Sequence, residues 1–274
     1  MNLHNHKIGF IGAGAMGSAL LTGMIKANLA DPSALFVSDA SQEHLQDITN
    51  RLKVRGCSEN IALAEQVDIL VLAVKPWVVK ELLPELRPVV KPGQLIISIA
   101  AGVTIPDLES GLADNVAVIR VMPNTPSQVG EGATAIALGK HVTPEQHNIA
   151  LAMFGAVGTA VTVQEGLMNS VTGLSGSGPA DMFMVLEARS DAGVKAGLPR
   201  DISTKLAAQT MLGAAKMVLE TGEHPGRLKD MVTTPGGTTI YGVHALEQSG
   251  ARSAIINAVM AAFQRANEMT GSKG

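Results

Sequence analysis

The sequence predicts an α/β protein in which a doubly wound parallel sheet is followed by an all-helical segment. Between Lys7 and about Val163, short apolar runs alternate with helical stretches, as in strands joined by crossover helices. A glycine-rich turn follows the first run, and after Glu165 the strand pattern disappears. These three observations predict two domains, residues 1–163 and residues 164–274.

The predicted strands are mostly apolar throughout, as expected for strands buried on both faces of a parallel sheet. They are Lys7–Ile11, Leu35–Ser38, Ile69–Val74, Leu95–Ser98, Val116–Val121, Ala133–Leu138 and Thr159–Val163. Helices are predicted between them at Ala15–Ala27 and Ser41–Leu52. Another should begin after Thr143-Pro144-Glu145-Gln146, a capping box with proline at the first helical position.

The second part contains long Ala/Leu/Met stretches separated by helix-breaking residues. The predicted helices are Ala180–Ala196, Arg200–Thr221, His224–Met231, Thr239–Ser249 and Ala251–Thr270. The run Leu206–Met217 is small and apolar around most of its circumference, so it requires burial on several sides. Because a short bundle offers few such places, we expect these helices to pack against another subunit.

Composition excludes several classes of protein. With 46% hydrophobic residues the 274-residue chain can bury a full core. A net charge of −3 and 3% aromatic residues argue against nucleic acid or anionic lipid as a partner. Cys57 stands alone, which favours a reducing compartment, and no targeting or membrane-spanning segment is visible, so we expect a soluble cytoplasmic protein. Seven scattered histidines predict no metal site.

The strongest motif is the turn Gly12-Ala13-Gly14-Ala15-Met16-Gly17, which follows the first strand and opens a helix. In such a turn Gly12 allows the tight bend, Gly14 allows close approach of a pyrophosphate, and Gly17 allows the helix to pack on the strand. The free N–H groups at the helix start then face the phosphates. The motif therefore predicts a Rossmann-type dinucleotide site.

Residues at the ends of other strands should border the same crevice, because ligands sit outside the carboxyl ends of parallel strands. Asp39, 22 residues after Gly17, would hold a ribose 2′-hydroxyl and favour NAD; alternatively it caps the helix near Ser41. Lys75, in Ala73-Val74-Lys75-Pro76, would face a phosphate or ribose unless it is a plain surface lysine. The small Ala100-Ala101-Gly102 suits a nicotinamide ring, although packing explains these residues nearly as well.

Two Gly/Ser/Thr/Pro segments interrupt the helical part, Leu174–Pro179 and Val232–Thr239. The second leads into a helix whose unpaired N–H groups could bind a small carboxylate, although an ordinary helix start is an equally good interpretation. Residues Asn169–Asp181 contain no lysine or histidine to serve as the base that a hydroxyacid dehydrogenase needs. A protonated imine needs no such base, since it is already electrophilic at carbon.

In combination the motifs resemble those of the pyrroline-5-carboxylate reductase family over nearly the whole chain. The matching segments are Gly12–Gly17, Ala73–Pro76, Ser98-Ile99-Ala100-Ala101-Gly102-Val103, Met122-Pro123-Asn124-Thr125-Pro126, Gly173–Ala180 and Lys229–Thr239. The resemblance implies a Rossmann domain and a helical dimerisation domain, with reduction of pyrroline-5-carboxylate to L-proline by NADPH or NADH. It also implies a homodimer through the C-terminal helices, assembled further into a ring such as a decamer.

The resemblance also implies roles for individual residues. Asn60 and Lys75 would contact the cofactor, Thr239 would hydrogen-bond the ring nitrogen of the substrate, and Glu223 would come from the partner subunit. The candidate cofactor-binding residues are Gly12, Ala13, Gly14, Ala15, Met16, Gly17, Ser38, Asp39, Asn60, Ala73, Val74, Lys75, Pro76, Ala100, Ala101 and Gly102. The candidate substrate-binding residues are Val232, Thr234, Gly237, Thr238, Thr239 and Glu223, and the candidate catalytic residues are Thr239 and Ser177.

Two positions depart from the family pattern. Asp181 stands where an aromatic residue is usual and Arg189 where a small one is expected; they are not four residues apart, so a local ion pair does not explain them. One alternative function is therefore a reductase of the same architecture that acts on another cyclic imine or on a 3-hydroxy acid, the latter disfavoured by the missing base. A second alternative, of a different class, is non-catalytic dinucleotide sensing. A sensor would need the glycine turn but not the Val232–Thr239 segment, which disfavours it.

Overall fold

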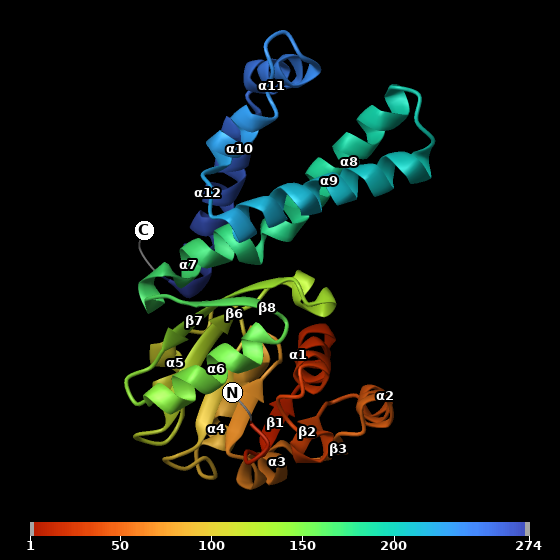
Figure 1. Cartoon of the computed structure of the whole chain (residues 1–274). Coiled ribbons are helices and arrows are strands. Elements are labelled where there is room, and N and C mark those ends of the chain that lie inside the picture. The colour runs from red at the N-terminus through yellow and green to blue at the C-terminus, as the bar shows by residue number, and fades with distance from the viewer. Residues whose placement is uncertain (1–2, 272–274) are drawn as a thin grey trace. The chain divides into compact units, whose positions relative to one another are not determined.

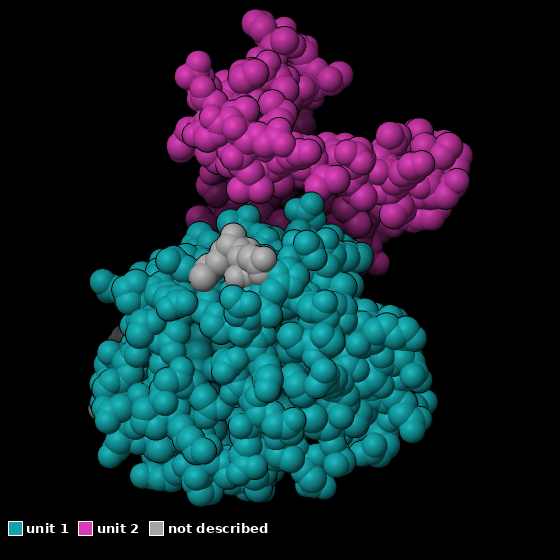
Figure 2. Space-filling view, turned by 60° about the horizontal axis from the view of Figure 1, so that its bottom comes forward, with its two compact units in different colours: residues 1–177, 262–274 teal, residues 178–261 magenta. Residues whose placement is uncertain are grey.

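A computed structural model describes residues 3–271 of the chain, which form two compact units. Unit 1 consists of the residues up to Ser177 together with those from Ala262 onward, and unit 2 is Gly178–Ala261. Figure 2 colours the two units separately. Unit 1 contains a sheet with helices, and unit 2 is helical throughout (Figure 1).

The strands described in unit 1 form one sheet in the order β3-β2-β1-β4-β5-β6-β7-β8. All neighbouring strands are parallel except β6 and β7, which are antiparallel. The bounds are β1 Ile8–Ile11, β2 Leu35–Ser38, β3 Arg55–Gly56, β4 Ile69–Leu72, β5 Leu95–Ser98, β6 Ala117–Met122, β7 Gly132–Leu138 and β8 Gly158–Thr162. The chain runs outward from β1 to β3 and then returns past β1 to β4, so the strand order reverses next to β1. The predicted doubly wound sheet is thereby confirmed.

Helices cover both faces of the sheet and enclose two hydrophobic clusters. The helices are α1 Ala15–Lys26, α2 Gln42–Leu52, α3 Asn60–Gln66, α4 Pro76–Leu86, α5 Ile105–Gly111 and α6 Pro144–Gly155. Side chains of α1, α2 and α6 pack in one cluster, and side chains of α3, α4 and α5 pack in the other. Alternate strand residues enter opposite clusters, Phe10 the first and Ile11 the second. Burial on both faces explains why the strands are apolar throughout.

The predicted capping box at the start of α6 is present. The Thr143 hydroxyl accepts from the Gln146 N–H at 3.2 Å, and the Gln146 side chain accepts from the Thr143 N–H at 3.0 Å. A second capping box, not predicted from sequence, joins Thr104 and Asp107 at the start of α5. Short irregular turns complete this unit: η1 Pro32–Ala34, η2 Thr125–Val129, η3 Glu165–Leu167 and the π-helical η4 Thr172–Gly176.

The helical part begins with the short α7, Met168–Val171, in unit 1. Its longer helices are α8 Gly178–Lys195, α9 Arg200–Thr221, α10 Pro225–Met231, α11 Thr238–Gln248 and α12 Ala251–Thr270. Helices α8 and α9 pair through small polar residues: Ser203 donates to the Ser190 carbonyl at 2.7 Å, and the Ser190 hydroxyl lies 2.7 Å from that of Thr204.

Unit 2 lacks an apolar core within a single chain. Among residues 178–261, only Ser190, Ser203 and Ala207 are buried, and none of these is large and apolar. Many large apolar side chains are exposed instead, including Phe183, Leu206, Leu212, Met217, Leu219, Tyr241 and Ile256. Because burial of such side chains is the main stabilising contribution in folding, these helices require another surface to pack against. This agrees with the expectation drawn from Leu206–Met217.

The compact units divide between Ser177 and Gly178, whereas the boundary predicted from sequence lies between residues 163 and 164. Met168 of α7 is fully buried in the cluster beneath α4 and α5, so α7 belongs with the sheet. The Asn169 amide donates to Asn267 at 2.8 Å and to Thr270 at 2.9 Å, which brings the end of α12 back to the same unit. These contacts join residues about a hundred positions apart, which local patterns do not reveal.

No helix within residues 3–271 is both long enough and apolar enough to cross a membrane. Over the same residues, the structure contains no cluster of three or more His, Cys, Asp or Glu side chains arranged to hold a metal ion.

Candidate active site

The glycine turn after β1 has the geometry that close approach by a ligand requires. Gly12 has φ +105°, and a Cβ there would lie 2.5 Å from the Ala73 carbonyl oxygen. At Gly17 a Cβ would collide with the Gly12 carbonyl oxygen, so this glycine lets α1 pack against the turn. Gly14 differs from both, because no atom lies within 4 Å of the place where its Cβ would be.

Gly14 is also the N-cap of α1 and makes no side-chain cap. The first N–H groups of the helix therefore lack side-chain partners and point toward the open space over Gly14. Together with the partial positive charge of a helix start, these groups form a site for an anion such as a pyrophosphate. The tight bend at Gly12 and the close packing at Gly17 are those that the spacing predicts, and the approach of a pyrophosphate at Gly14 stays a prediction.

A cavity of about 680 Å³ begins at this turn and extends over the carboxyl ends of β1, β2, β4, β5 and β6. Its volume lies within the range of small-molecule and cofactor sites, about 300–1,000 Å³. Most of the candidate cofactor-binding residues line it: Gly12, Gly14, Ala15, Met16, Asp39, Asn60, Ala73, Val74, Lys75, Pro76, Ala100 and Ala101. The structure therefore brings together motifs that lie up to ninety residues apart in sequence.

Four candidate cofactor residues do not line the cavity. Ala13 is buried, and its N–H donates to the Asp39 carboxylate at 2.7 Å. Ser38 is buried and donates to the Asn60 side chain at 2.7 Å, so it positions a lining residue from behind. Gly17 packs under the turn, as described above, and Gly102 is in a turn beyond the cavity, with φ +77°.

Several lining residues are absent from the candidate set. They are Ile11, Ala40, Ser58, Val78, Leu82, Ile99, Met122, Pro123, Thr125 and Gln128. Met122, Pro123 and Thr125 belong to a segment that carries the family resemblance; Met122 ends the buried strand β6, and the other two follow it. The rule that ligands sit at the carboxyl ends of strands could therefore have identified them. Gln128 lies in η2, for which the sequence offers no comparable signal.

Asp39 lies at the end of β2, and its two carboxylate oxygens have different partners. Oδ2 accepts from the Ala13 N–H at 2.7 Å, and Oδ1 accepts from the Ser41 N–H at 2.8 Å. The N-cap of α2 is Ser41, whose hydroxyl accepts from the His44 N–H at 3.3 Å. Asp39 thus joins the glycine turn to the turn before α2, while Ser41 caps the helix.

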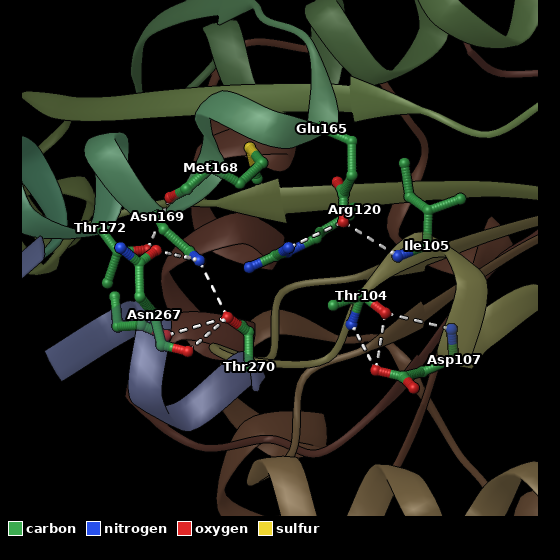
Figure 3. A network of polar contacts seen from close by, with 11 residues as sticks. Thr104, Ile105, Asp107, Arg120, Glu165, Met168, Asn169, Thr172, Asn267 and Thr270 are labelled. Atoms are coloured by element: carbon green, nitrogen blue, oxygen red, sulfur yellow. Dashed lines mark hydrogen bonds and ion pairs between the residues drawn. The ribbon is translucent and has the colours of Figure 1, made fainter. Parts of the chain in front are cut away.

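A polar network supports the segment after β5, which contributes Ala100 and Ala101 to the cavity (Figure 3). Arg120 of β6 is buried, and its guanidinium forms an ion pair with Glu165 at 2.8 Å. The same Glu165 oxygen accepts from the Ile105 N–H at 3.1 Å, at the start of α5. Helix α5 begins only three residues after Gly102, so this contact anchors the segment that leads away from the cavity.

The start of α5 is held further by its capping box. The Thr104 N–H donates to Asp107 at 2.9 Å, and the Thr104 hydroxyl donates to the same carboxylate at 2.7 Å. Partial burial acts to raise the pKa of Asp107, but the backbone and side-chain hydrogen bonds from Thr104 outweigh burial and lower the pKa below its ordinary value. The carboxylate is therefore the form that stabilises this helix start.

The candidate substrate segment lies in unit 2, at the start of α11. Gly237 is the N-cap of this helix and has no side chain to cap it, while the Gly237 N–H donates to the Thr234 carbonyl at 3.1 Å. The preceding Gly236 has φ +66°, which turns the chain into the helix. Thr238 and Thr239 occupy the first turn, so their hydroxyls flank the uncapped N–H groups.

The remaining candidate residues have other local partners. Val232 is exposed just after α10, and Glu223 forms an exposed ion pair with Arg227 at 3.3 Å. Ser177 is exposed at the end of η4, where its N–H donates to the Thr172 carbonyl at 2.9 Å. Asp181 is half-buried in the first turn of α8 and Arg189 is exposed two turns later; nothing in the structure explains their departure from the family pattern.

Comparisons with known proteins identify a dinucleotide-binding part and a dimerisation part in the chain. Residues 165–269 match the family model described as pyrroline-5-carboxylate reductase dimerisation, and residues 7–102 match the model of NADP oxidoreductase, coenzyme F420-dependent. The chain is 51% identical to a pyrroline-5-carboxylate reductase of Methanosarcina acetivorans, over 97% of this chain and 99% of that one. It is 42% identical to the Arabidopsis thaliana enzyme of the same name, over 97% and 96% of the two chains.

Solved structures give the same result. A pyrroline-5-carboxylate reductase from Coxiella burnetii superposes with a TM-score of 0.92 at 37% identity, covering 98% of this chain and 99% of that one. A pyrroline carboxylate reductase from Plasmodium falciparum with NADP bound gives a TM-score of 0.87 at 34% identity, covering 97% and 99%. The chain therefore belongs to the pyrroline-5-carboxylate reductase family.

Proposed function

We propose that the chain reduces 1-pyrroline-5-carboxylate to L-proline with NADPH or NADH. The observation that carries this proposal is the open space over Gly14 at the start of α1, within a cavity of dinucleotide size. The bound cofactor supplies the hydride for addition to the imine carbon. Sequence similarity to pyrroline-5-carboxylate reductases over nearly the whole length of the chain supports this substrate rather than another cyclic imine.

The residues of unit 1 hold and orient the dinucleotide. The first N–H groups of α1 bind the pyrophosphate, and Asp39 at the end of β2 receives the adenine-side ribose. Ala100 and Ala101, small residues lining the cavity beyond β5, leave room for a flat nicotinamide ring. Lys75 and Asn60 line the cavity between these regions and contact the cofactor.

The Thr234–Thr239 segment binds the substrate carboxylate through the uncapped N–H groups at the start of α11. Thr239 hydrogen-bonds the ring nitrogen, and Glu223 of the partner subunit and Ser177 complete the site. As the hydride adds to the imine carbon of the protonated substrate, the C=N π electrons become the lone pair of the amine nitrogen. No side chain has to remove a proton during that step, so a site of hydroxyls and backbone donors is sufficient.

The exposed apolar side chains of α8 and α9 support dimerisation through the helical unit, and we propose that dimers assemble into a ring such as a decamer. Sedimentation equilibrium measures the size of the assembly directly, and a stable monomer would contradict dimerisation through the helical unit. The single cysteine of the chain fits a reducing compartment, and we place the enzyme in the cytoplasm.

The function is tested by mixing purified protein with reduced nicotinamide cofactor and pyrroline-5-carboxylate, with product analysis by chromatography. Oxidation of the cofactor with matching formation of proline supports the proposal. Cofactor binding without oxidation, observed with both NADH and NADPH, would contradict it.

A further inference from the structure

The Asp39 carboxylate is held in place by backbone groups on both sides. The Ala13 N–H, inside the glycine turn, donates to Oδ2 at 2.7 Å, and the Ser41 N–H donates to Oδ1 at 2.8 Å. Rotation of the side chain away from the cavity would break both bonds, and both N–H groups would lose their acceptor. The carboxylate is therefore a fixed feature of the cavity wall.

A fixed carboxylate at the end of β2 discriminates between the two nicotinamide cofactors. A carboxylate has about four acceptor positions, and the two backbone bonds occupy only two of them. The others remain available for the 2′-hydroxyl of a ribose, which can donate. A 2′-phosphate offers only acceptors and negative charge when fully ionised, so it meets the same carboxylate with repulsion.

Neither of the two residues that follow Asp39 is a cation. The next two residues are Ala40 and Ser41, and the Ser41 hydroxyl already caps α2. Among the residues that line the cavity, the one cation is Lys75, which follows β4. In the sheet order β2-β1-β4, the end of β4 is two strands from Asp39, or about 10 Å at the usual spacing of 4.8 Å.

We propose that Asp39 makes this chain prefer NADH to NADPH, an inference that depends on the proposed use of a nicotinamide dinucleotide. Asp39 acts in two ways: it binds the ribose, and through Ala13 it fixes the backbone of the glycine turn. The first action depends on the 2′ substituent, and the second is common to both cofactors.

The test is calorimetric titration of the full-length protein with NADH and with NADPH, without any imine. One charge-assisted hydrogen bond to the ribose corresponds to a preference of at least about tenfold for NADH. In Asp39→Ser, the ratio of NADPH to NADH dissociation constants should fall by at least about tenfold. Adding Ala40→Arg to this variant supplies a cation for a 2′-phosphate and should invert the preference.

Asp114→Asn is the matched control, since it removes the same charge from an exposed residue before the amino end of β6. The affinity ratio should stay unchanged in this variant, and a shift as large as that of Asp39→Ser would attribute the effect to overall charge and overturn the proposal. Equally weakened binding of NADH and NADPH in Asp39→Ser would also overturn the proposal, because it would show that Asp39 acts only by fixing the backbone of the glycine turn. Equal or tighter binding of NADPH by the unmodified protein also overturns it. Turnover with pyrroline-5-carboxylate, measured separately, tests the proposed reaction independently of this preference.

Discussion

Gly14→Ala should weaken cofactor binding while leaving folding intact, because no protein atom lies near the place of the added Cβ. The backbone at Gly14 has φ −61° and ψ −175°, which any L-residue adopts, and no atom lies within 4 Å of the added Cβ. The methyl group would project into the space where the pyrophosphate approaches the turn. The folded protein should accept the substitution, whereas the bound cofactor should not.

The magnitudes follow from the same geometry. Alanine at a compatible φ restricts the unfolded chain but is a poorer N-cap than glycine, so the free energy of unfolding should change by less than about 1 kcal/mol. Overpacking by one methyl group costs about 1–3 kcal/mol in the bound complex, which raises the dissociation constant of either cofactor about 5- to 150-fold. At Gly12, with φ +105° and the Ala73 oxygen 2.5 Å from the Cβ, alanine should instead destabilise the fold by about 2–5 kcal/mol.

Urea unfolding and calorimetric titration of the two variants distinguish these effects. For Gly14→Ala we expect a normal unfolding midpoint with weakened binding of NADH and NADPH alike. Gly12→Ala serves as the contrasting control, with a lowered midpoint. Unaltered cofactor affinity in a folded Gly14→Ala protein would refute the assignment of this turn as the pyrophosphate site.

Three further predictions concern the rest of the molecule. Thr239→Ala should lower kcat about 10-fold or more by removing a hydrogen bond to the substrate nitrogen, whereas the affinity for cofactor, measured by calorimetry, should not change. Unchanged turnover would remove Thr239 from the mechanism. Glu165→Ala leaves the buried Arg120 without its ion-pair partner and should reduce the free energy of unfolding by about 3 kcal/mol in urea titrations. Glu165→Gln keeps a hydrogen-bond acceptor and should lose less. A loss below about 1 kcal/mol in Glu165→Ala would show that the ion pair is not structurally important. Leu212→Lys places a charge on the exposed apolar surface of α9 and should shift the protein toward monomers in sedimentation, whereas Lys216→Ala, on the same helix, should not; an unchanged assembly would place the interface elsewhere.

Much of the fold was predictable because its signals are local. Strands such as Ile69–Leu72 are apolar throughout because both faces are buried, and the capping box of α6 lies within four residues. The strand β3, Arg55–Gly56, was missed because it is two residues long and exposed. The extent of the two compact units depends on contacts such as that of Asn169 with Asn267, which no local pattern encodes.

The site was predictable to the extent that it follows from sheet topology. Because parallel strands end at one edge, Gly12, Asp39 and Lys75 could be assigned to one cavity from sequence alone. Sequence did not distinguish lining residues from those that support them, such as Ala13 and Ser38, since that depends on side-chain and backbone partners. Nor did it show that Asp39 and Ser41 have separate roles, because both are acceptors near the same helix start.

Reduction of pyrroline-5-carboxylate is measured directly by a reductase assay that follows both the loss of reduced nicotinamide and the formation of proline. We expect stoichiometric proline formation, faster with NADH than with NADPH at limiting cofactor. Tight binding of both cofactors with no consumption of either, in protein that sediments as the folded oligomer, would rule out this reaction.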